Sequence, residues 1–378
     1  MRVKVPRNQL LLHLQMSQNI VERKTTLPIL SHLLIETLPS HLKLSSTDLE
    51  VGVSDLCEAE ILQEGSTTVH ARKFYEIVRE LPEQDMELLV KGETLEVRSG
   101  RSRFKLHPFS PDEFPKIPPV DTSDSIFLNG SVLQEMIQKV SISVSLDETR
   151  YTLTGILTQM EEQERNTVFR MVSTDGHRLS FCERVLEGTG CLAALTAKRE
   201  EQERRDVILP KKAVQEMRRI TEAGDGLEFG VFQENAFVRK ENFFRIMRLV
   251  RGKFPDYKAV IPANVFKKIT VDAQRLEEAL RRVSLLSTDK ARGARFLVES
   301  GKMTVLSTSP EIGEAEEELD LAYEGDPFEL SFNIRYLLDY LPMAKGEVSM
   351  EFGEDLRPCL IRESSDPKSF YVVMPLRA

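Results

Sequence analysis

The chain repeats one pattern three times, and this repetition limits the folds available to it more than any other feature does. The first motif of the pattern is a short strand-like entry followed by an amphipathic helix. In the second copy Leu133 and Ile137 fall on one helical face, and in the third copy Leu276 and Leu280 do the same. The motif reads VPRNQLLLHLQ from Val5, LNGSVLQEMIQ from Leu128 and VDAQRLEEALR from Val271.

Three further motifs follow in the same order in each copy. A strand runs into a turn, a second amphipathic helix follows, and a closing strand ends the copy. Motifs that recur in one order indicate structural units of similar build. The turns lie in SSTDLEV (from Ser45), VSTDGHRLS (from Val172) and LSTSPEIGE (from Leu306); the helices are ARKFYEIVREL (from Ala71), PKKAVQEMRRI (from Pro210) and FNIRYLLDYL (from Phe332); the closing strands begin at Arg103, Phe244 and Phe370.

Two strand-then-helix halves in each copy predict an α+β fold with three similar domains. Each domain is expected to pack two helices on antiparallel sheets. Proline-rich or polar segments at 118–125 and 261–268 read as linkers, which places the domains at 1–122, 123–263 and 264–378. The segment 185–206 is longer than its counterparts and ends in a charged run, so we interpret it as a surface insertion.

Composition excludes some classes of function. The chain has 378 residues and a formal charge of 51 − 60 = −9, which argues against a basic surface that coats nucleic acid but leaves room for a local basic face. The N-terminus lacks the features of a signal peptide, and no apolar run is long enough to span a bilayer, so a cytoplasmic location is expected. The cysteines lack metal-binding spacing and are expected to be reduced thiols: Cys57, Cys182, Cys191 and Cys359.

The stretch STDGHRLS gathers Ser173, Asp175 and His177 within five residues, which could suggest a hydrolytic or metal site. It occupies the same place in its repeat as SSTDLE and STSPEI do in theirs. Asp-Gly there is typical of a turn between two strands, and the members of a catalytic triad normally come from distant segments. We therefore interpret the stretch as structural, with a hydrolase that uses Asp175, His177 and a nearby serine as the alternative.

No other motif indicates an enzyme. The sequence contains no phosphate-binding G-x-x-x-x-G-K-[ST] loop, no G-x-S-x-G elbow, and neither H-E-x-x-H nor C-x-x-C. The acidic run 314–320 (EAEEELD) lacks the glycine and the alternating acidic residues of a calcium loop. No catalysis, cofactor or metal is expected.

Two charge patterns carry positive information. Several helices carry basic residues, such as Lys211 and Lys212, away from their apolar faces. These residues either form an ordinary solvated helix surface or line a path for a phosphate backbone. The segment RSGRSRFK (98–105) is basic and the segment EAEEELD (314–320) is acidic. Opposite charges near opposite ends of a chain favour head-to-tail assembly into a ring, although chance patchiness gives the same pattern.

Together these features resemble a known family, the bacterial DNA sliding clamps, which are the β subunits of the replicative DNA polymerase holoenzyme. The matching segments run in order along essentially the whole chain: TLPIL (26–30), STDLE, ARKF, RSGRSRF, STDGHRL, FPDY, FN with Tyr336, and the terminal YVVMPLR. The resemblance implies a head-to-tail homodimer whose six domains close a ring around duplex DNA. It implies a processivity factor that binds double-stranded DNA without sequence specificity and catalyses nothing itself.

The resemblance also implies a hydrophobic cleft for short linear peptides. Its expected partners are the catalytic subunit of the replicative polymerase, the clamp loader, and repair and translesion polymerases. Methionine and branched aliphatic walls suit several different peptides. Carried over position by position, the cleft would contain Leu153, Thr174, Gly176, His177, Arg178, Leu179, Pro255, Val260, Asn333, Tyr336, Val372, Val373, Met374, Pro375, Leu376 and Arg377.

The family's other contacts can be carried over in the same way. The chain departs from the family's pattern at Ala259, Ala291 and Ala378, which bears on peptide preference. A monomeric peptide-binding scaffold without a DNA role is the remaining alternative. DNA contacts are expected at Lys24, Arg150 and Tyr151, together with Lys211 and Lys212; the dimer interface is expected at Arg103, Phe104, Leu106, Leu285, Leu286, Glu314, Glu316 and Glu317.

Overall fold

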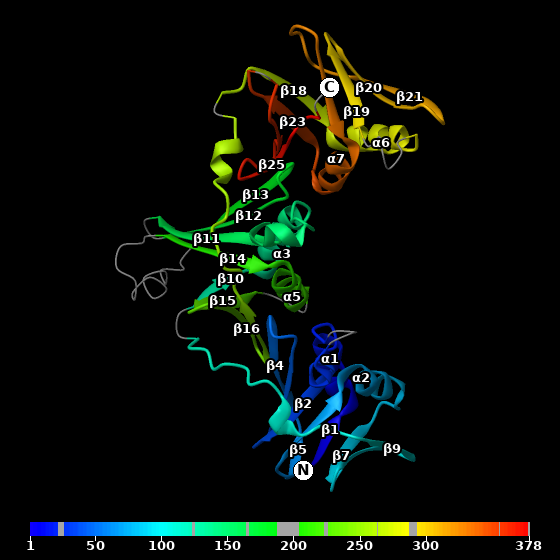
Figure 1. Cartoon of the computed structure of the whole chain (residues 1–378), viewed down its shortest axis with the longest axis vertical. Helices are drawn as coiled ribbons and strands as arrows, with labels where there is room; N and C mark the ends of the chain where they lie inside the picture. The colour runs from blue at the N-terminus through cyan, green and yellow to red at the C-terminus, as the bar shows by residue number, and fades with distance from the viewer. Residues whose placement is uncertain are drawn as a thin grey trace. The chain divides into compact units, whose positions relative to one another are not determined.

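The structure is a computed structural model of the whole chain (Figure 1). It describes residues 1–21, 26–122, 125–163, 166–186, 204–222, 226–262, 264–286, 293–354 and 356–376. Most of the predicted insertion at 185–206 lies outside these residues. The described residues form two compact units, of which the first draws on Met1–Leu133 and Lys212–Leu249, and the second on Gln134–Gly190, Glu201–Lys211 and Val250–Ala378.

The first unit contains two antiparallel sheets. A five-stranded sheet has the order β5-β1-β7-β8-β9, and an eight-stranded sheet has the order β10-β15-β16-β17-β4-β3-β2-β6. The strands of the smaller sheet are β1 (Arg2–Pro6), β5 (Glu60–Gln63), β7 (Asp85–Lys91), β8 (Thr94–Ser99) and β9 (Ser102–Leu106). Those of the larger sheet are β2 (His32–Leu38), β3 (His41–Thr47), β4 (Val51–Glu58), β6 (Ser66–His70), β10 (Ser125–Leu128), β15 (Leu227–Phe232), β16 (Asn235–Lys240) and β17 (Phe243–Arg248).

Helices α1 (Arg7–Ser17) and α2 (Ala71–Glu80) pack together in the first unit and lie side by side in Figure 1. Their apolar faces enter one core, where Leu10, Leu14 and Phe74 are buried against strands of both sheets. Burial of the stripe at helical spacing stabilises such helices more than intrinsic propensity does. A third helix, α5 (Lys211–Glu222), begins directly after strand β14 (Arg204–Pro210).

The second unit also contains two antiparallel sheets, one eight-stranded and one four-stranded. The eight-stranded sheet has the order β14-β11-β12-β13-β25-β24-β23-β18, and the four-stranded sheet has the order β21-β20-β19-β22. The strands of the first are, besides β14, β11 (Gly155–Gln163), β12 (Asn166–Thr174), β13 (Arg178–Leu186), β18 (Lys267–Asp272), β23 (Glu347–Phe352), β24 (Cys359–Glu363) and β25 (Ser369–Val373). Those of the second are β19 (Gly293–Glu299), β20 (Lys302–Ser309), β21 (Gly313–Asp320) and β22 (Phe328–Asn333).

Helices α6 (Ala273–Ser284) and α7 (Ile334–Tyr340) pack together against the four-stranded sheet (Figure 1). Both begin at a polar residue that caps the helix. The Asp272 carboxylate accepts a hydrogen bond from the Arg275 backbone N–H at 2.9 Å, and the Asn333 side chain accepts one from the Arg335 N–H at 3.1 Å. With α3 (Gly130–Ser141), the described part of each of the three repeats contains two α-helices, as the sequence pattern predicts.

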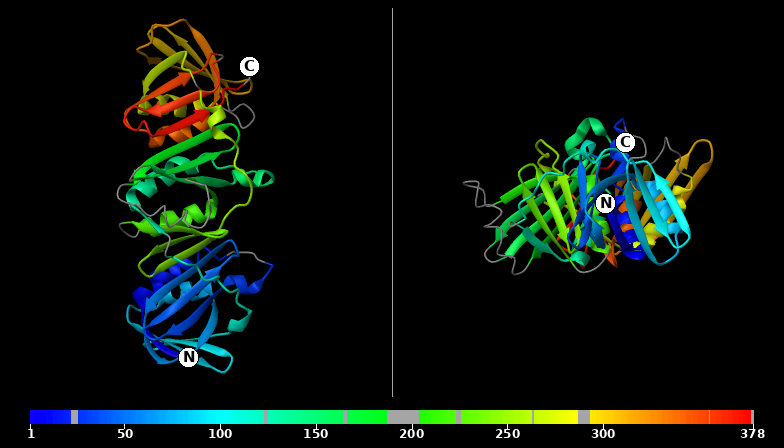
Figure 2. Two further views of the ribbon diagram at one scale, coloured as in Figure 1. Left: turned by 90° about the vertical axis from the view of Figure 1, so that its left-hand side faces the viewer. Right: turned by 90° about the horizontal axis from the view of Figure 1, so that it is seen from below.

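Strands from different repeats join within each eight-stranded sheet. Strand β4 of the first repeat pairs with β17 of the second, and β13 of the second repeat pairs with β25 of the third. Figure 2 shows the red strand β25 beside the green strand β13. The second repeat therefore contributes strands to both units, and the predicted α+β fold of antiparallel sheets and paired helices is confirmed.

Three of the cysteines are free and buried: Cys57, Cys182 and Cys359. Burial raises the pKa of the Cys57 thiol to about 12, and Glu58 and Asp55 add to the effect. These thiols are therefore protonated at neutral pH and unreactive, while Cys191 lies outside the described residues. Among the described residues, no helix is both long and apolar enough to cross a membrane.

Candidate functional site

The stretch STDGHRLS forms the tight turn that joins β12 to β13. The Asp175 carboxylate accepts hydrogen bonds from the backbone N–H groups of His177 and Arg178, at 2.9 and 3.0 Å. Gly176 has a φ of 89°, in the left-handed region that favours glycine. Ser173 is fully buried and its hydroxyl donates to the Val140 carbonyl. Asp175 therefore builds a turn rather than orienting a base, and the three side chains do not form a catalytic triad.

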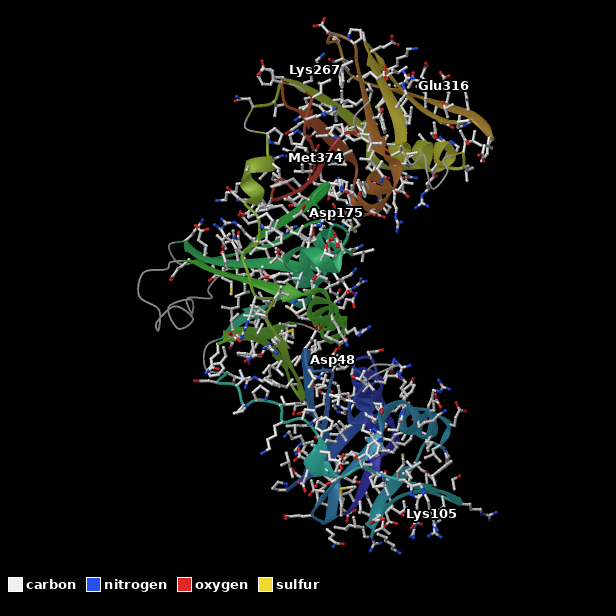
Figure 3. The ribbon with its side chains drawn as sticks, viewed as in Figure 1. Asp48, Lys105, Asp175, Lys267, Glu316 and Met374 are labelled. Atoms are coloured by element: carbon white, nitrogen blue, oxygen red, sulfur yellow. The ribbon has the colours of Figure 1, made fainter. Side chains whose placement is uncertain are left out.

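A cleft of about 150 Å³ opens beside this turn, within the second unit. It lies where the turn, the end of β25 and the segment after Phe254 meet. Figure 3 shows Asp175 and Met374 near one another at this place. The lining residues are Leu153, Thr174, Gly176, His177, Arg178, Leu179, Pro255, Asp256, Tyr257, Val260, Val372 and Met374.

The cleft has an apolar floor and a partly exposed apolar rim. Leu179 and Val372 are buried at its base, on paired strands, whereas Val260 and Met374 are exposed. An apolar peptide side chain that displaces water from these surfaces gains about 25 cal/mol per Å² of apolar area. The arrangement can therefore hold a short peptide by apolar contact, with the polar turn at one side to orient it.

Ten of the predicted cleft residues lie on its wall, and five of the other six have described positions elsewhere in the second unit. Asn333 caps α7, and Tyr336 lies against Arg178. Val373 is buried within β25, and Leu376 is exposed beyond that strand. Pro375 is buried just before Leu376, whereas Arg377, Ala291 and Ala378 lie outside the described residues.

The family resemblance did not predict two of the lining residues, Asp256 and Tyr257. The Asp256 carboxylate accepts a hydrogen bond from the Lys258 N–H at 3.1 Å and caps the short helix η4 (Tyr257–Val260), which carries Ala259. The Tyr257 hydroxyl donates to the Gln159 side chain at 2.9 Å. The segment FPDY, which places both residues directly after Pro255, is the sequence signal that could have found them.

Arg178 anchors the turn to the rest of the unit. Its guanidinium pairs with Asp175 at 3.0 Å and with Asp339 of α7 at 2.5 Å. Burial acts to lower the pKa of Arg178, but Tyr371 and the two carboxylates outweigh burial and raise it. The charge is therefore permanent, and it holds one wall of the cleft against α7.

The residues predicted to contact DNA differ in their surroundings. Tyr151 is exposed, and the Arg150 guanidinium pairs with Asp147 at 3.0 Å. Lys211 is half-buried at the start of α5, and Lys212 pairs with Asp48 while its Nζ also donates to the Ile20 carbonyl at 3.1 Å. A phosphate at Lys212 would have to compete with that carboxylate. Lys24 lies outside the described residues.

The first group of predicted interface residues lies on an edge strand. Arg103, Phe104 and Leu106 belong to β9, the last strand of the five-stranded sheet. Arg103 pairs with Glu96, and Phe104 is exposed. An edge strand presents backbone N–H and C=O groups that can pair with another chain.

The second group lies on another edge strand and at the end of a helix. Glu314, Glu316 and Glu317 belong to β21, the outermost strand of the four-stranded sheet. Glu317 already pairs with Arg282 at 2.6 Å. Leu285 follows α6 and is exposed, and Leu286 is half-buried. Figure 3 labels Lys105 on the basic edge and Glu316 on the acidic edge.

Within the described ranges, no group of three or more histidine, cysteine, aspartate or glutamate residues could hold a metal ion. The cleft and the two charged edges remain as the candidate functional surfaces of the structure.

Comparison with known proteins supports the resemblance to the bacterial DNA sliding clamps. Family models of the DNA polymerase III beta subunit match in order: the N-terminal domain at residues 1–118, the central domain at 127–256 and the C-terminal domain at 258–377. The beta sliding clamps of Pseudomonas putida and Escherichia coli are 35% and 33% identical over 381 residues, and each alignment covers 100% of both chains.

Solved structures agree with the sequence comparison. A DNA polymerase sliding clamp from Caulobacter crescentus matches with a TM-score of 0.92 at 33% identity. A Bartonella birtlesii sliding clamp, solved with griselimycin bound, matches with a TM-score of 0.92 at 31% identity. Both matches cover 100% of each chain. The chain therefore belongs to the bacterial β sliding clamps, the non-catalytic β subunits of DNA polymerase III.

Proposed function

We propose that this chain is a replicative sliding clamp, two copies of which close head to tail into a ring around duplex DNA. The ring retains the polymerase at the primer end and so acts as a processivity factor in the cytoplasm. The match of three clamp domains in order along one chain carries this proposal. The proposed domain boundaries are 1–122, 123–263 and 264–378.

Encirclement accounts for a DNA-binding protein with a net charge of −9. A closed ring is held by topology, so a strong attraction to phosphates is unnecessary and would slow sliding. We assign weak phosphate contacts to Lys24, Arg150, Tyr151, Lys211 and Lys212. The ion pairs of Arg150 and Lys212 support a modest contribution, because each phosphate contact would compete with an internal carboxylate.

We assign ring closure to the two charged edges. The basic strand β9 of one protomer would lie beside the acidic strand β21 of its partner, with Phe104 and Leu106 against Leu285 and Leu286. Opposite charges on exposed edge strands and an exposed leucine support this pairing.

The apolar cleft is the surface that we assign to peptides of the polymerase, the clamp loader and repair or translesion polymerases. A bound peptide tethers its protein to DNA and replaces repeated encounters from solution with a high local concentration. The apolar floor and the exposed Met374 rim support this assignment.

Primer extension tests the proposal. The loaded protein should lengthen the products that the cognate replicative polymerase makes in one binding event, and Met374→Ala should shorten them. Leu62→Ala is the matched control, because Leu62 is 43% exposed and Met374 is 39% exposed. The proposal is wrong if product length does not depend on the protein; the cleft assignment is wrong if the two variants behave alike.

A further inference from the structure

We propose that the first unit carries a second peptide-docking groove, built on the same backbone frame as the cleft but selective for a peptide that combines an aliphatic and an acidic side chain. This inference rests on the proposed function, because it takes the cleft of the second unit to be a peptide site. The groove has a volume of about 310 Å³. Its lining residues are Thr47, Leu49, Glu50, Gly52, Pro115, Lys116, Ile117, Pro118, Glu234, Asn235, Ile246 and Arg248.

The turn that borders this groove repeats the hydrogen bonds of the turn that borders the cleft. Asp48 accepts hydrogen bonds from the backbone N–H groups two and three residues further along the chain, at 3.0 and 2.7 Å. Asp175 does the same at 2.9 and 3.0 Å. The Thr47 hydroxyl accepts from the second residue after it at 3.0 Å, and the Thr174 hydroxyl does so at 3.1 Å.

The paired strands at the base of the two sites share one register. Ile246 of β17 lies opposite Gly52 of β4, as Val372 of β25 lies opposite Leu179 of β13. In each site one further backbone hydrogen bond joins the residue after the last paired residue of the strand to the turn. The Arg248 N–H donates to the Glu50 carbonyl at 2.8 Å, and the Met374 N–H donates to the His177 carbonyl at 2.9 Å.

A proline linker forms the outer wall in both sites. The sequence Phe-Pro occurs at 114–115 beside the groove and at 254–255 beside the cleft, and the residues that follow line each site. Turn, strand pair and linker therefore recur together. In the second unit this combination of turn, strand pair and linker forms the apolar cleft that we assign to peptides. We therefore infer that the same combination in the first unit also forms a peptide-binding groove.

The apolar surface of the groove is arranged differently. A side-chain carbon at Gly52 would lie 2.8 Å from the Ile246 side chain and 3.5 Å from that of Ile117. Because residue 52 is glycine, the side chains of Ile246 and Ile117 can pack directly against the β4 backbone. The equivalent position in the cleft is occupied by Leu179. These isoleucines and the exposed Leu49 offer branched aliphatic contacts to a peptide side chain of similar size.

The charges of the groove differ most from those of the cleft. Lys116 stands where the cleft has Asp256, and Arg248 stands where the cleft has Met374. Both basic residues are exposed. Glu50 and Glu234 also line the groove, which disfavours a peptide with many carboxylates. A single acidic side chain beside Lys116 and Arg248, next to an aliphatic one, complements this surface.

Selection from a random heptapeptide library displayed on phage tests the inference with the full-length protein. Each selected peptide is then synthesised, labelled with fluorescein and titrated by anisotropy against the wild type, Met374→Ala and the double variant Lys116→Glu/Arg248→Glu. We expect a class of peptides with an aliphatic residue and an Asp or Glu that binds Met374→Ala normally. This class should bind the double variant at least about tenfold more weakly.

Lys91→Glu is the control for charge reversal, because Lys91 is exposed at the end of strand β7 and does not line the groove. Peptides that weaken equally on Lys91→Glu respond to net charge and would overturn the inference. If every selected peptide depends on Met374 and none on Lys116 and Arg248, the groove is not a docking site while the cleft assignment stands. If no peptide is selected at all, both assignments fail.

Discussion

The guanidinium of Arg178 lies 4.4 Å from the centre of the Tyr336 ring and pairs at 2.5 Å with Asp339, one helical turn further along α7. A cation over an aromatic face is attracted by the ring, and the carboxylate fixes its orientation. The Tyr371 hydroxyl of β25 donates to the Tyr336 carbonyl at 3.0 Å. The turn, α7 and β25 are therefore linked at the wall of the cleft.

Arg178→Ala should weaken peptide binding at the cleft by about tenfold, because the wall loses its anchor while Asp175 and Asp339 lose their common partner. We expect a decrease of about 2 kcal/mol in the free energy of unfolding of this unit. Peptide anisotropy and urea denaturation measure the two effects. Arg178→Lys should recover part of the stability but less of the affinity, since lysine lacks the planar fork; equal affinity for both variants would contradict the proposed role.

Leu285→Ala should shift the protein from dimer to monomer without affecting its folding. Leu285 is 78% exposed in one chain and lies at the predicted interface, where a partner would remove its apolar surface from water. Leu146→Ala is the matched control, because Leu146 is 80% exposed and belongs to no predicted interface. Sedimentation velocity at several concentrations measures the change. An equal shift for both variants would argue against Leu285 as an interface residue.

Arg245→Met should destabilise the first unit by about 3–5 kcal/mol, because it leaves the Asp55 carboxylate buried without its guanidinium partner. Both residues are fully buried, and the second guanidinium nitrogen of Arg245 lies 3.2 Å from Asp55 Oδ2. The double variant Arg245→Met/Asp55→Leu should recover much of the loss, because two apolar side chains replace the ion pair. Urea denaturation measures both, and a double variant as unstable as the single one would contradict this explanation.

Asp366 should make the second unit sensitive to acid. Burial acts to raise the pKa of Asp366, but hydrogen bonds from Lys139, Ser369 and Arg184 outweigh burial and lower it from 3.8 to about 2. A lowered pKa in the folded state gives stability that is present above about pH 4 and is lost as the pH falls to about 2. After allowance for solvent screening, the contribution is about 1 kcal/mol.

The matched variant for this acid effect is Asp366→Asn. Its difference from the wild type in the free energy of unfolding should be largest at pH 5 and should shrink as the pH is lowered to 2.5. Denaturation by urea at each pH gives this difference. A difference that stays constant over the range would show that the carboxylate does not titrate as its lowered pKa requires.

The repeated motifs predicted much of the fold because each motif is stabilised by interactions between residues that are close in sequence. Asp48 and Asp175 build their turns with hydrogen bonds to the next few residues, so the turn is encoded where it forms. The helix faces are similarly local, since Leu276 and Leu280 are one turn apart and both are buried. Eight of the ten correctly predicted cleft residues lie within the quoted family motifs, whereas Leu153 and Val260 lie outside them and were placed by their position in the family alone.

The contacts that the sequence did not predict join distant segments. Nothing near Arg178 in the sequence indicates Asp339 as its partner, because the pairing depends on where α7 packs. The pairing of β4 with β17 likewise joins residues that are 190 or more positions apart in the sequence, and no local pattern indicates it. Gly52 appears unremarkable in the sequence, and only the approach of Ile246 and Ile117 shows why a side chain does not fit there.

Retention on circular DNA tests the central claim most directly. The protein is loaded onto a nicked circular plasmid by its cognate clamp loader, separated from free protein by gel filtration, and the plasmid is then cut once. We predict that the protein stays with the circular plasmid at moderate salt and is released within minutes of cutting, because a ring slides off a free end. Protein that remains on the linear plasmid as long as on the circle would contradict encirclement and indicate ordinary binding to the DNA surface.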